Sequence, residues 1–271
     1  MSSAAKTLGL LAYFSPTRPE IGLSQLCKLA GRDKATTYRH LQALEDTGFV
    51  EQNPATKQYR LGPAVLQLAQ TREITVPRKA GAEHALSELA EATGETSHVS
   101  VLSGSTVYAL ASCESPQHST RAIIDIQTFP LHATASGLCA LAFGSADLMA
   151  YACKNIQIFT ATTVQTPDAL RTAVETVRQT GFAWSGGALE IEVQGLAAPV
   201  FDHTGLLAGS ISVASVATRF TPELQETIQR NLIIASREIT RNWGGTIPDS
   251  LEAKWASSLS NTNPQIMEFS K

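Results

Sequence analysis

Residues 23–50 read LSQLCKLAGRDKATTYRHLQALEDTGFV, and this stretch predicts two short helices joined by a tight turn. Ser24 is placed to cap the first helix, and Gly31 is placed to end it, because glycine readily adopts the left-handed conformation that closes a helix. Asp33 is placed to cap a second helix over residues 34–47. Two short helices joined by a turn that contains glycine are typical of a helix-turn-helix.

The neighbouring segments extend this pattern to a winged helix-turn-helix domain over residues 1–62. Apolar residues at helical spacing predict a first helix over residues 5–14. Residues 49–52 and 58–61 are expected to form two short strands around a turn, which is the wing. The next segment, residues 63–76, again has helical spacing and is predicted to be a linker helix.

On a helical wheel, the helix of residues 34–47 has a packing side and an opposite side that can face a DNA groove. The packing side holds Thr37, Tyr38, Leu41, Leu44 and Glu45. On the opposite side, Arg39 is expected to contact a base, because a guanidinium can donate two hydrogen bonds to guanine. The predicted DNA-contacting residues are Lys34, Thr36, Arg39, His40 and Gln42 of this helix and Lys57 and Arg60 of the wing.

The charge of the chain is unevenly distributed. Residues 1–62 hold eight basic and five acidic residues, a balance of +3, whereas the remainder carries −6. A basic first quarter on an acidic body suits a nucleic-acid reader joined to a domain that avoids DNA. With 271 residues, 43% of them hydrophobic, the chain is long enough for two domains. It contains neither a membrane-spanning run nor a secretory signal, so we expect a cytoplasmic protein with no membrane partner.

The cysteines give no sign of a metal or redox site. Cys27, Cys113, Cys139 and Cys153 stand apart, without a C-x-x-C pair or a histidine spacing that would close a zinc site. They are interpreted as small hydrophobic residues in a reducing compartment. We expect neither a metal nor a cofactor.

The chain beyond residue 76 predicts an α+β domain over residues 77–245. Strands in hairpins with helices between them favour an antiparallel sheet. Residues 246–271 are rich in serine and asparagine and are interpreted as a polar tail. The expected helices cover residues 77–93, 135–153, 167–180 and 222–243, and the expected strands cover residues 96–102, 106–113, 195–201 and 206–214.

Several separated segments together resemble the IclR family of bacterial regulators. In the N-terminal domain these are residues 23–26, 34–45, 48–50 and the wing exit Tyr59-Arg60-Leu61-Gly62. In the body they are residues 114–116, 130–137, 181–183 and 197–200, which arrive in the order of the family. The resemblance covers about residues 5–243 and leaves the tail outside.

The resemblance implies a fold, partners and a mode of action. The C-terminal domain would have a curved antiparallel sheet flanked by helices (GAF-like) and would bind a small organic-acid effector. The protein would act as a dimer, or a dimer of dimers, on palindromic double-stranded operator DNA, with repression the expected sign. Such regulators commonly control genes of catabolism or transport.

The same resemblance places an effector pocket between the loop at residues 132–137 and the strands after residue 184. The start of a helix in this loop favours a carboxylate, because its free N–H groups and positive end attract anions. The alternative is that these small residues merely permit tight turns and sheet packing. The positions carried over are Ala135, Ser136, Gly137, Ser185, Val193, Gly195 and Ser212.

Two departures from the family pattern bear on the effector. Gly195 stands where many relatives carry cysteine, and Leu138 stands where lysine often occurs. Both changes remove polar reach, and Gly195 is expected to leave space, which favours a larger or more apolar ligand such as an aromatic acid. Four other residues are ligand candidates for which a structural or solvated role is the alternative: Glu190, Glu192, His98 and His132.

Two rival interpretations remain open at this point. An enzyme is disfavoured because the sequence has no G-x-S-x-G elbow, P-loop, G-x-G-x-x-G or H-E-x-x-H motif. The other rival is a winged helix used for contact between proteins, with a second domain that serves only to dimerise.

Overall fold

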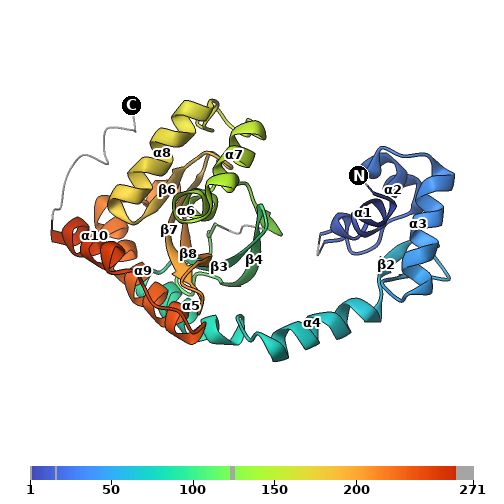
Figure 1. Cartoon of the computed structure of the whole chain (residues 1–271), viewed down its shortest axis with the longest axis horizontal. Helices are drawn as coiled ribbons and strands as arrows, with labels where there is room; N and C mark the ends of the chain where they lie inside the picture. Colours follow the sequence, from blue (N-terminus) through green and yellow to red (C-terminus); the bar gives the residue numbers. More distant parts are fainter. Residues whose placement is uncertain (1, 16, 123–125, 261–271) are drawn as a thin grey trace. The chain divides into compact units, whose positions relative to one another are not determined.

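The computed structural model describes residues 2–15, 17–122 and 126–260 (Figure 1). The chain divides into two compact units, Met1–Pro77 and Arg78–Lys271. No helix in the described part of the chain combines the length and the apolar character that a membrane span requires.

The first unit is a winged helix-turn-helix, as the sequence predicts. Its elements are α1 (Ser3–Leu8), η1 (Leu11–Tyr13), α2 (Leu23–Ala30), α3 (Lys34–Asp46), β1 (Val50–Gln52), β2 (Tyr59–Leu61) and α4 (Pro63–Thr75). The two strands pair antiparallel, with Glu51 opposite Arg60. A small core holds the helices and the wing together, and its buried side chains are Leu10, Phe14, Ile21, Leu26, Leu41, Leu44, Val50 and Tyr59.

The turn between α2 and α3 follows the expected chemistry, with one correction. Gly31 ends α2 in the left-handed conformation (φ 61°), and the Asp33 carboxylate accepts a hydrogen bond of 2.9 Å from the Thr36 N–H. That hydrogen bond is the main cause of a lowered pKa for Asp33. The expected cap at Ser24 is wrong, because α2 already begins at Leu23 and Gly22 occupies the cap position.

The first helix is divided in two, and the linker helix has, among the residues that the structure describes, no buried side that matches the helical spacing of its apolar residues. The single helix expected over residues 5–14 is two shorter ones, because α1 ends at Leu8, before Gly9, which is a poor helix former. Helix α4 spans Pro63–Thr75 and buries none of its side chains within the described chain. Leu66, Leu68 and Ile74 are 62%, 56% and 81% exposed.

The second unit is built on a six-stranded sheet in the order β5-β4-β3-β8-β7-β6, with every neighbouring pair antiparallel. The fold predicted for this part, an antiparallel sheet with helices between its strands, is confirmed. The strands are β3 (Thr96–Ser103), β4 (Thr106–Cys113), β5 (Thr128–Phe129), β6 (Ala183–Gly186), β7 (Val193–Phe201) and β8 (Leu207–Val216). Strands β5 and β6 are short, lie at the two edges of the sheet and were not among the predicted strands.

Helices cover both faces of this sheet (Figure 1). On one face, α5 (Ala80–Thr93) and α9 (Pro222–Asn242) pack over a core that includes Leu196 and Ile211. On the other, α6 (Ala135–Phe143), α7 (Ala146–Lys154) and α8 (Pro167–Thr180) enclose a second core. The helix expected over residues 135–153 is therefore two helices. The break comes at Gly144, after which the Ser145 hydroxyl caps α7 by accepting from the Leu148 N–H.

The interpretation of residues 246–271 as a polar tail is wrong for the part that the structure describes. Asp249–Ser260 form helix α10, in which Leu251 and Trp255 are buried in the core beside α9. The signal was present in the sequence, because Ile247, Leu251 and Trp255 recur every four residues. The many serine and asparagine residues around them led to the interpretation as a polar tail. Residues 261–271 lie outside the described residues.

Candidate functional site

The outer face of α3 is available to a partner. Lys34, Tyr38 and Arg39 are exposed, and Thr36 and Gln42 are half-buried. Thr37, Leu41 and Leu44 are buried, which places the packing side where the helical wheel put it. Tyr38 is an exception, because it was expected to pack and is 49% exposed. Tyr38 precedes Arg39 in α3, and its exposure makes it a further candidate contact that the helical wheel did not predict.

His40 is not placed to contact DNA, contrary to the prediction, because its side chain faces the interior of the unit. Its side chain is buried, and Nδ1 lies 2.6 Å from the Thr7 Oγ1. Burial lowers the pKa of His40, and the nearby charges of Arg39, Arg32 and Lys6 lower it further. The imidazole therefore joins α3 to α1 inside the unit and does not face outward.

Near His40 lie two basic residues, Lys6 and Arg32, that were not among the predicted DNA contacts. Lys6, Arg32 and Arg39 lie close enough to His40 to affect its titration, although they come from three segments of the chain. Arg32 also donates a hydrogen bond of 2.9 Å to the Lys6 carbonyl. Arg32 lies just before α3 and Arg39 lies within it, so both are further candidates to hold a phosphate.

Of the two predicted cations of the wing, Lys57 has no side-chain partner among the residues that the structure describes, whereas Arg60 is paired. Lys57 is exposed and takes a positive φ of 58° at the tip. Arg60 is already paired, with Nε 2.6 Å from the Glu51 carboxylate and Nη1 3.8 Å from Glu20. Arg60 must exchange these partners to hold a phosphate, whereas Lys57 need not. On α3, the Gln42 amide similarly donates to Asp46 at 3.0 Å.

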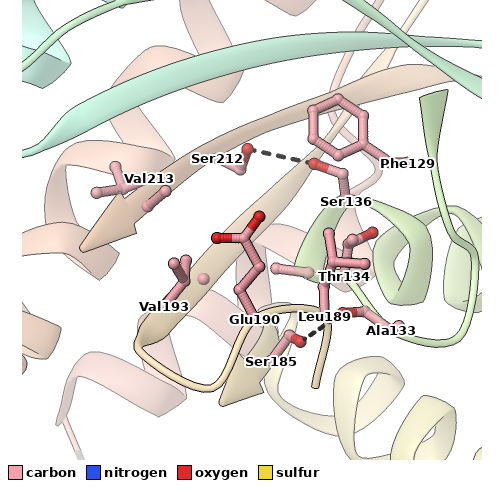
Figure 2. Close-up of a pocket in the computed structure, with 13 residues that line it drawn as sticks. Phe129, Ala133, Thr134, Ser136, Ser185, Leu189, Glu190, Val193, Ser212 and Val213 are labelled. Carbon is pink, nitrogen blue, oxygen red and sulfur yellow. Dashed lines mark hydrogen bonds between the residues drawn. The ribbon is translucent and has the colours of Figure 1, made fainter. Parts of the chain in front are cut away.

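A pocket in the second unit lies between the start of α6 and strands β6, β7 and β8 (Figure 2). Its open space is about 480 Å³, solvent at its mouth included. Six of the seven predicted effector positions line it, all except Gly137. The lining residues are Phe129, Ala133, Thr134, Ala135, Ser136, Ser185, Leu189, Glu190, Val193, Gly195, Ser212, Val213 and Ala214.

Hydroxyl groups join the two walls of the pocket. Ser136 on α6 donates a hydrogen bond of 3.2 Å to Ser212 on β8, and both side chains are buried (Figure 2). Ser212 in turn donates to the His98 carbonyl at 3.4 Å. Ser185 donates at 3.0 Å to the carbonyl of Ala133, which fixes the loop before α6. These bonds hold the start of α6 against the sheet.

Gly137 has a packing role. Its N–H donates at 3.0 Å to the hydroxyl of Thr134, which caps α6. A Cβ at this position would lie 2.4 Å from the Pro130 carbonyl oxygen, so a side chain is excluded. Gly137 is thus corrected from a pocket-lining residue to one that lets α6 start close beneath the preceding loop.

Gly195 also acts by close approach. A Cβ there would lie 3.3 Å from the Ala135 Cβ, so the missing side chain lets α6 lie near β7. Gly195 also lines the pocket, and the extra space expected from it stays a prediction. The walls are mostly apolar, because Phe129, Leu189 and Val193 line them.

Titratable side chains around the pocket fall into different environments. Glu190 and Glu192 are both exposed. Glu190 lines the pocket (Figure 2), whereas Glu192 does not. His132 is structural, because its Nε2 lies 2.7 Å from the carbonyl oxygen and 3.1 Å from the N–H nitrogen of Gln157. Its ring also stacks on Phe159.

An exposed recognition helix with a wing, carried on the same chain as a larger α+β unit, defines the class of DNA-binding transcription regulators. Comparison with known proteins agrees. Residues 3–54 match the IclR helix-turn-helix domain, and residues 75–241 match the family described as bacterial transcriptional regulator IclR C-terminal. The chain belongs to the IclR family, and its relatives are regulators, not enzymes.

Individual relatives match over most of their length. An IclR transcriptional regulator of Silicibacter sp. TM1040, known from a crystal structure, is 38% identical with a TM-score of 0.84, and the match covers 92% of this chain and 99% of that one. The regulator XynR of Escherichia coli K12 is 27% identical over 81% of this chain and 88% of its own. The transcriptional repressor YiaJ of the same organism is 28% identical over 85% and 84%.

Proposed function

We propose that this chain represses catabolic or transport genes by binding a palindromic operator and that a small organic acid, with an aromatic acid the expected class, controls its affinity for DNA. The main support for an acidic effector is that α6 begins at the pocket, where Ala135 and Ser136 line it. Helix geometry leaves the N–H groups of Ala135 and Ser136 without intrahelical acceptors. These groups and the positive end of the helix favour a carboxylate, while the apolar walls favour a hydrocarbon body.

The sign of regulation and the assembly have separate support. YiaJ, a relative, is a repressor. A homo-oligomer, either a dimer or a dimer of dimers, is supported by α4, which leaves Leu66, Leu68 and Ile74 exposed on a helix without buried side chains. A second copy of the chain is the occupant that we propose for this surface, since a palindromic operator requires a two-fold symmetric protein. Chromosomal DNA as the target implies a cytoplasmic protein.

Titration of upstream DNA at several salt concentrations tests the DNA-binding part. Because phosphate contacts release counterions, we expect the affinity to fall by about 10³–10⁵ between 50 and 200 mM salt if the oligomer makes roughly six to ten such contacts. Footprinting should show a protected palindrome upstream of a neighbouring catabolic or transport gene. A winged helix that serves only protein contacts would give neither a footprint nor a salt dependence.

Substitution of Glu190 by glutamine tests the charge of the effector. The Glu190 carboxylate lines the pocket and repels an anion, so Glu190→Gln should tighten the binding of a carboxylic acid by about two- to five-fold, as measured by calorimetry. Glu192→Gln is the matched control and should leave the affinity unchanged, because Glu192 lies outside the lining. Weaker binding in Glu190→Gln would show instead that the effector carries a cationic or amide group that Glu190 holds.

A further inference from the structure

A buried imidazole lies behind the effector pocket. His98 on β3 is 6% exposed and stands directly opposite Ser212 of β8 in the strand register. Side chains of directly opposed residues point to the same face of a sheet. Because Ser212 lines the pocket, the imidazole of His98 lies on the pocket face of the sheet.

The imidazole has an unsatisfied nitrogen. His98 Nε2 is buried and has no hydrogen-bond partner among the described residues. Burial lowers the pKa of His98 to about 4, so the ring is neutral at pH 7 and each of its nitrogens is either a donor or an acceptor. An unpaired buried polar group of this kind is unfavourable, and a hydrogen bond from a suitable ligand group would remove this cost.

Phe129 connects this histidine to the pocket. Its ring meets the His98 ring edge-on, with centroids 6.4 Å apart and an angle of 73° between the planes. The same Phe129 side chain lines the pocket (Figure 2). Phe129 is therefore the side chain that the pocket lining shares with the surroundings of the imidazole.

We propose that the effector is a hydroxylated carboxylic acid and that His98 determines specificity for it. The imidazole forms a hydrogen bond with the hydroxyl group of the effector. This inference rests on the proposed function, which places the carboxylate of the effector at the start of α6. The two ends of the ligand are then recognised differently. The carboxylate meets helix N–H groups, and the hydroxyl meets a neutral imidazole across the apolar space beside Phe129. A site with a buried polar group rejects analogues that leave this group unpaired.

Calorimetric titration of the full chain with benzoate and with 2-, 3- and 4-hydroxybenzoate tests the proposal. We expect at least one hydroxybenzoate to bind about ten-fold more tightly than benzoate, the gain from one buried hydrogen bond. In His98→Leu this preference should fall to less than two-fold. His98→Gln keeps a neutral donor and acceptor and should restore part of the preference.

Thermal unfolding of the same variants controls for a merely structural role. His98→Leu removes an unsatisfied polar atom from a buried position, so its melting temperature should not fall. A preference that persists in a folded His98→Leu protein would overturn the proposal, as would equal binding of benzoate and all three hydroxybenzoates to the wild-type chain. Binding of none of the four acids would overturn the aromatic-acid effector together with the role proposed for His98, whereas operator binding would stand.

Discussion

Replacing Arg39 by alanine is expected to weaken binding to the proposed operator by about 1–3 kcal/mol for each half-site. Arg39 is exposed on α3, and its neighbours Thr37 and Leu41 anchor the helix in the core, so the guanidinium is presented on a rigid support. A bidentate contact to one guanine would be lost. Competition binding with operators changed at single base pairs should therefore show that Arg39→Ala no longer discriminates at one base pair of each half-site.

Two further substitutions separate base recognition from charge. Lys57→Ala at the wing tip should weaken binding to all DNA sequences to a similar extent, because a phosphate contact carries no sequence information. It should also make the affinity depend less steeply on salt concentration. Arg171→Ala is the control for loss of an exposed arginine, since Arg171 lies on α8 of the second unit and pairs with Asp168. If Arg39→Ala and Lys57→Ala both bind like the wild type, α3 is not the recognition helix.

The sequence predicted the helix-turn-helix well because its determinants are local. Gly31 and the Asp33 cap act within a few residues, and a helical wheel separates Leu41 and Leu44 from Arg39 without any knowledge of the rest of the fold. His40 and Tyr38 were misplaced for the opposite reason. Whether a residue at the flank of a helix is buried depends on what packs beside it, and for His40 that is Thr7 of α1, 33 positions away.

The effector pocket likewise combines features that the sequence predicts with features that depend on contacts between distant segments. Resemblance located Ser136, Ser185 and Ser212 because family position carries over one residue at a time, and all three line the pocket. The effect of Gly195 could not be read in this way. Its consequence depends on the distance to Ala135 on another element, which only the three-dimensional structure supplies. The unpaired nitrogen of His98 is likewise a property of its surroundings and not of its residue type.

Replacing Trp255 by alanine is expected to lower the free energy of unfolding by about 3–5 kcal/mol. Trp255 is fully buried, its ring stacks on Phe182 at 6.1 Å, and Nε1 donates a hydrogen bond of 3.1 Å to the Gly181 carbonyl. Gly181 has a φ of 80° and no side chain, which allows this close approach. For a unit of this size, the substitution should lower the melting temperature by roughly 6–20 °C.

Two milder variants identify the origin of that loss. Trp255→Phe retains an aromatic ring but not the indole N–H. Loss of this hydrogen bond should lower the free energy of unfolding by about 1 kcal/mol, in addition to a loss of packing that is smaller than in Trp255→Ala. Ser257→Ala is an exposed neighbour on α10 and should change the free energy of unfolding by less than about 0.5 kcal/mol. A melting temperature for Trp255→Ala within 2 °C of the wild type would mean that α10 is not docked on the second unit in solution. A large loss would make this C-terminal helix part of the core that supports Phe182 and strand β6, and through β6 the wall of the pocket at Ser185.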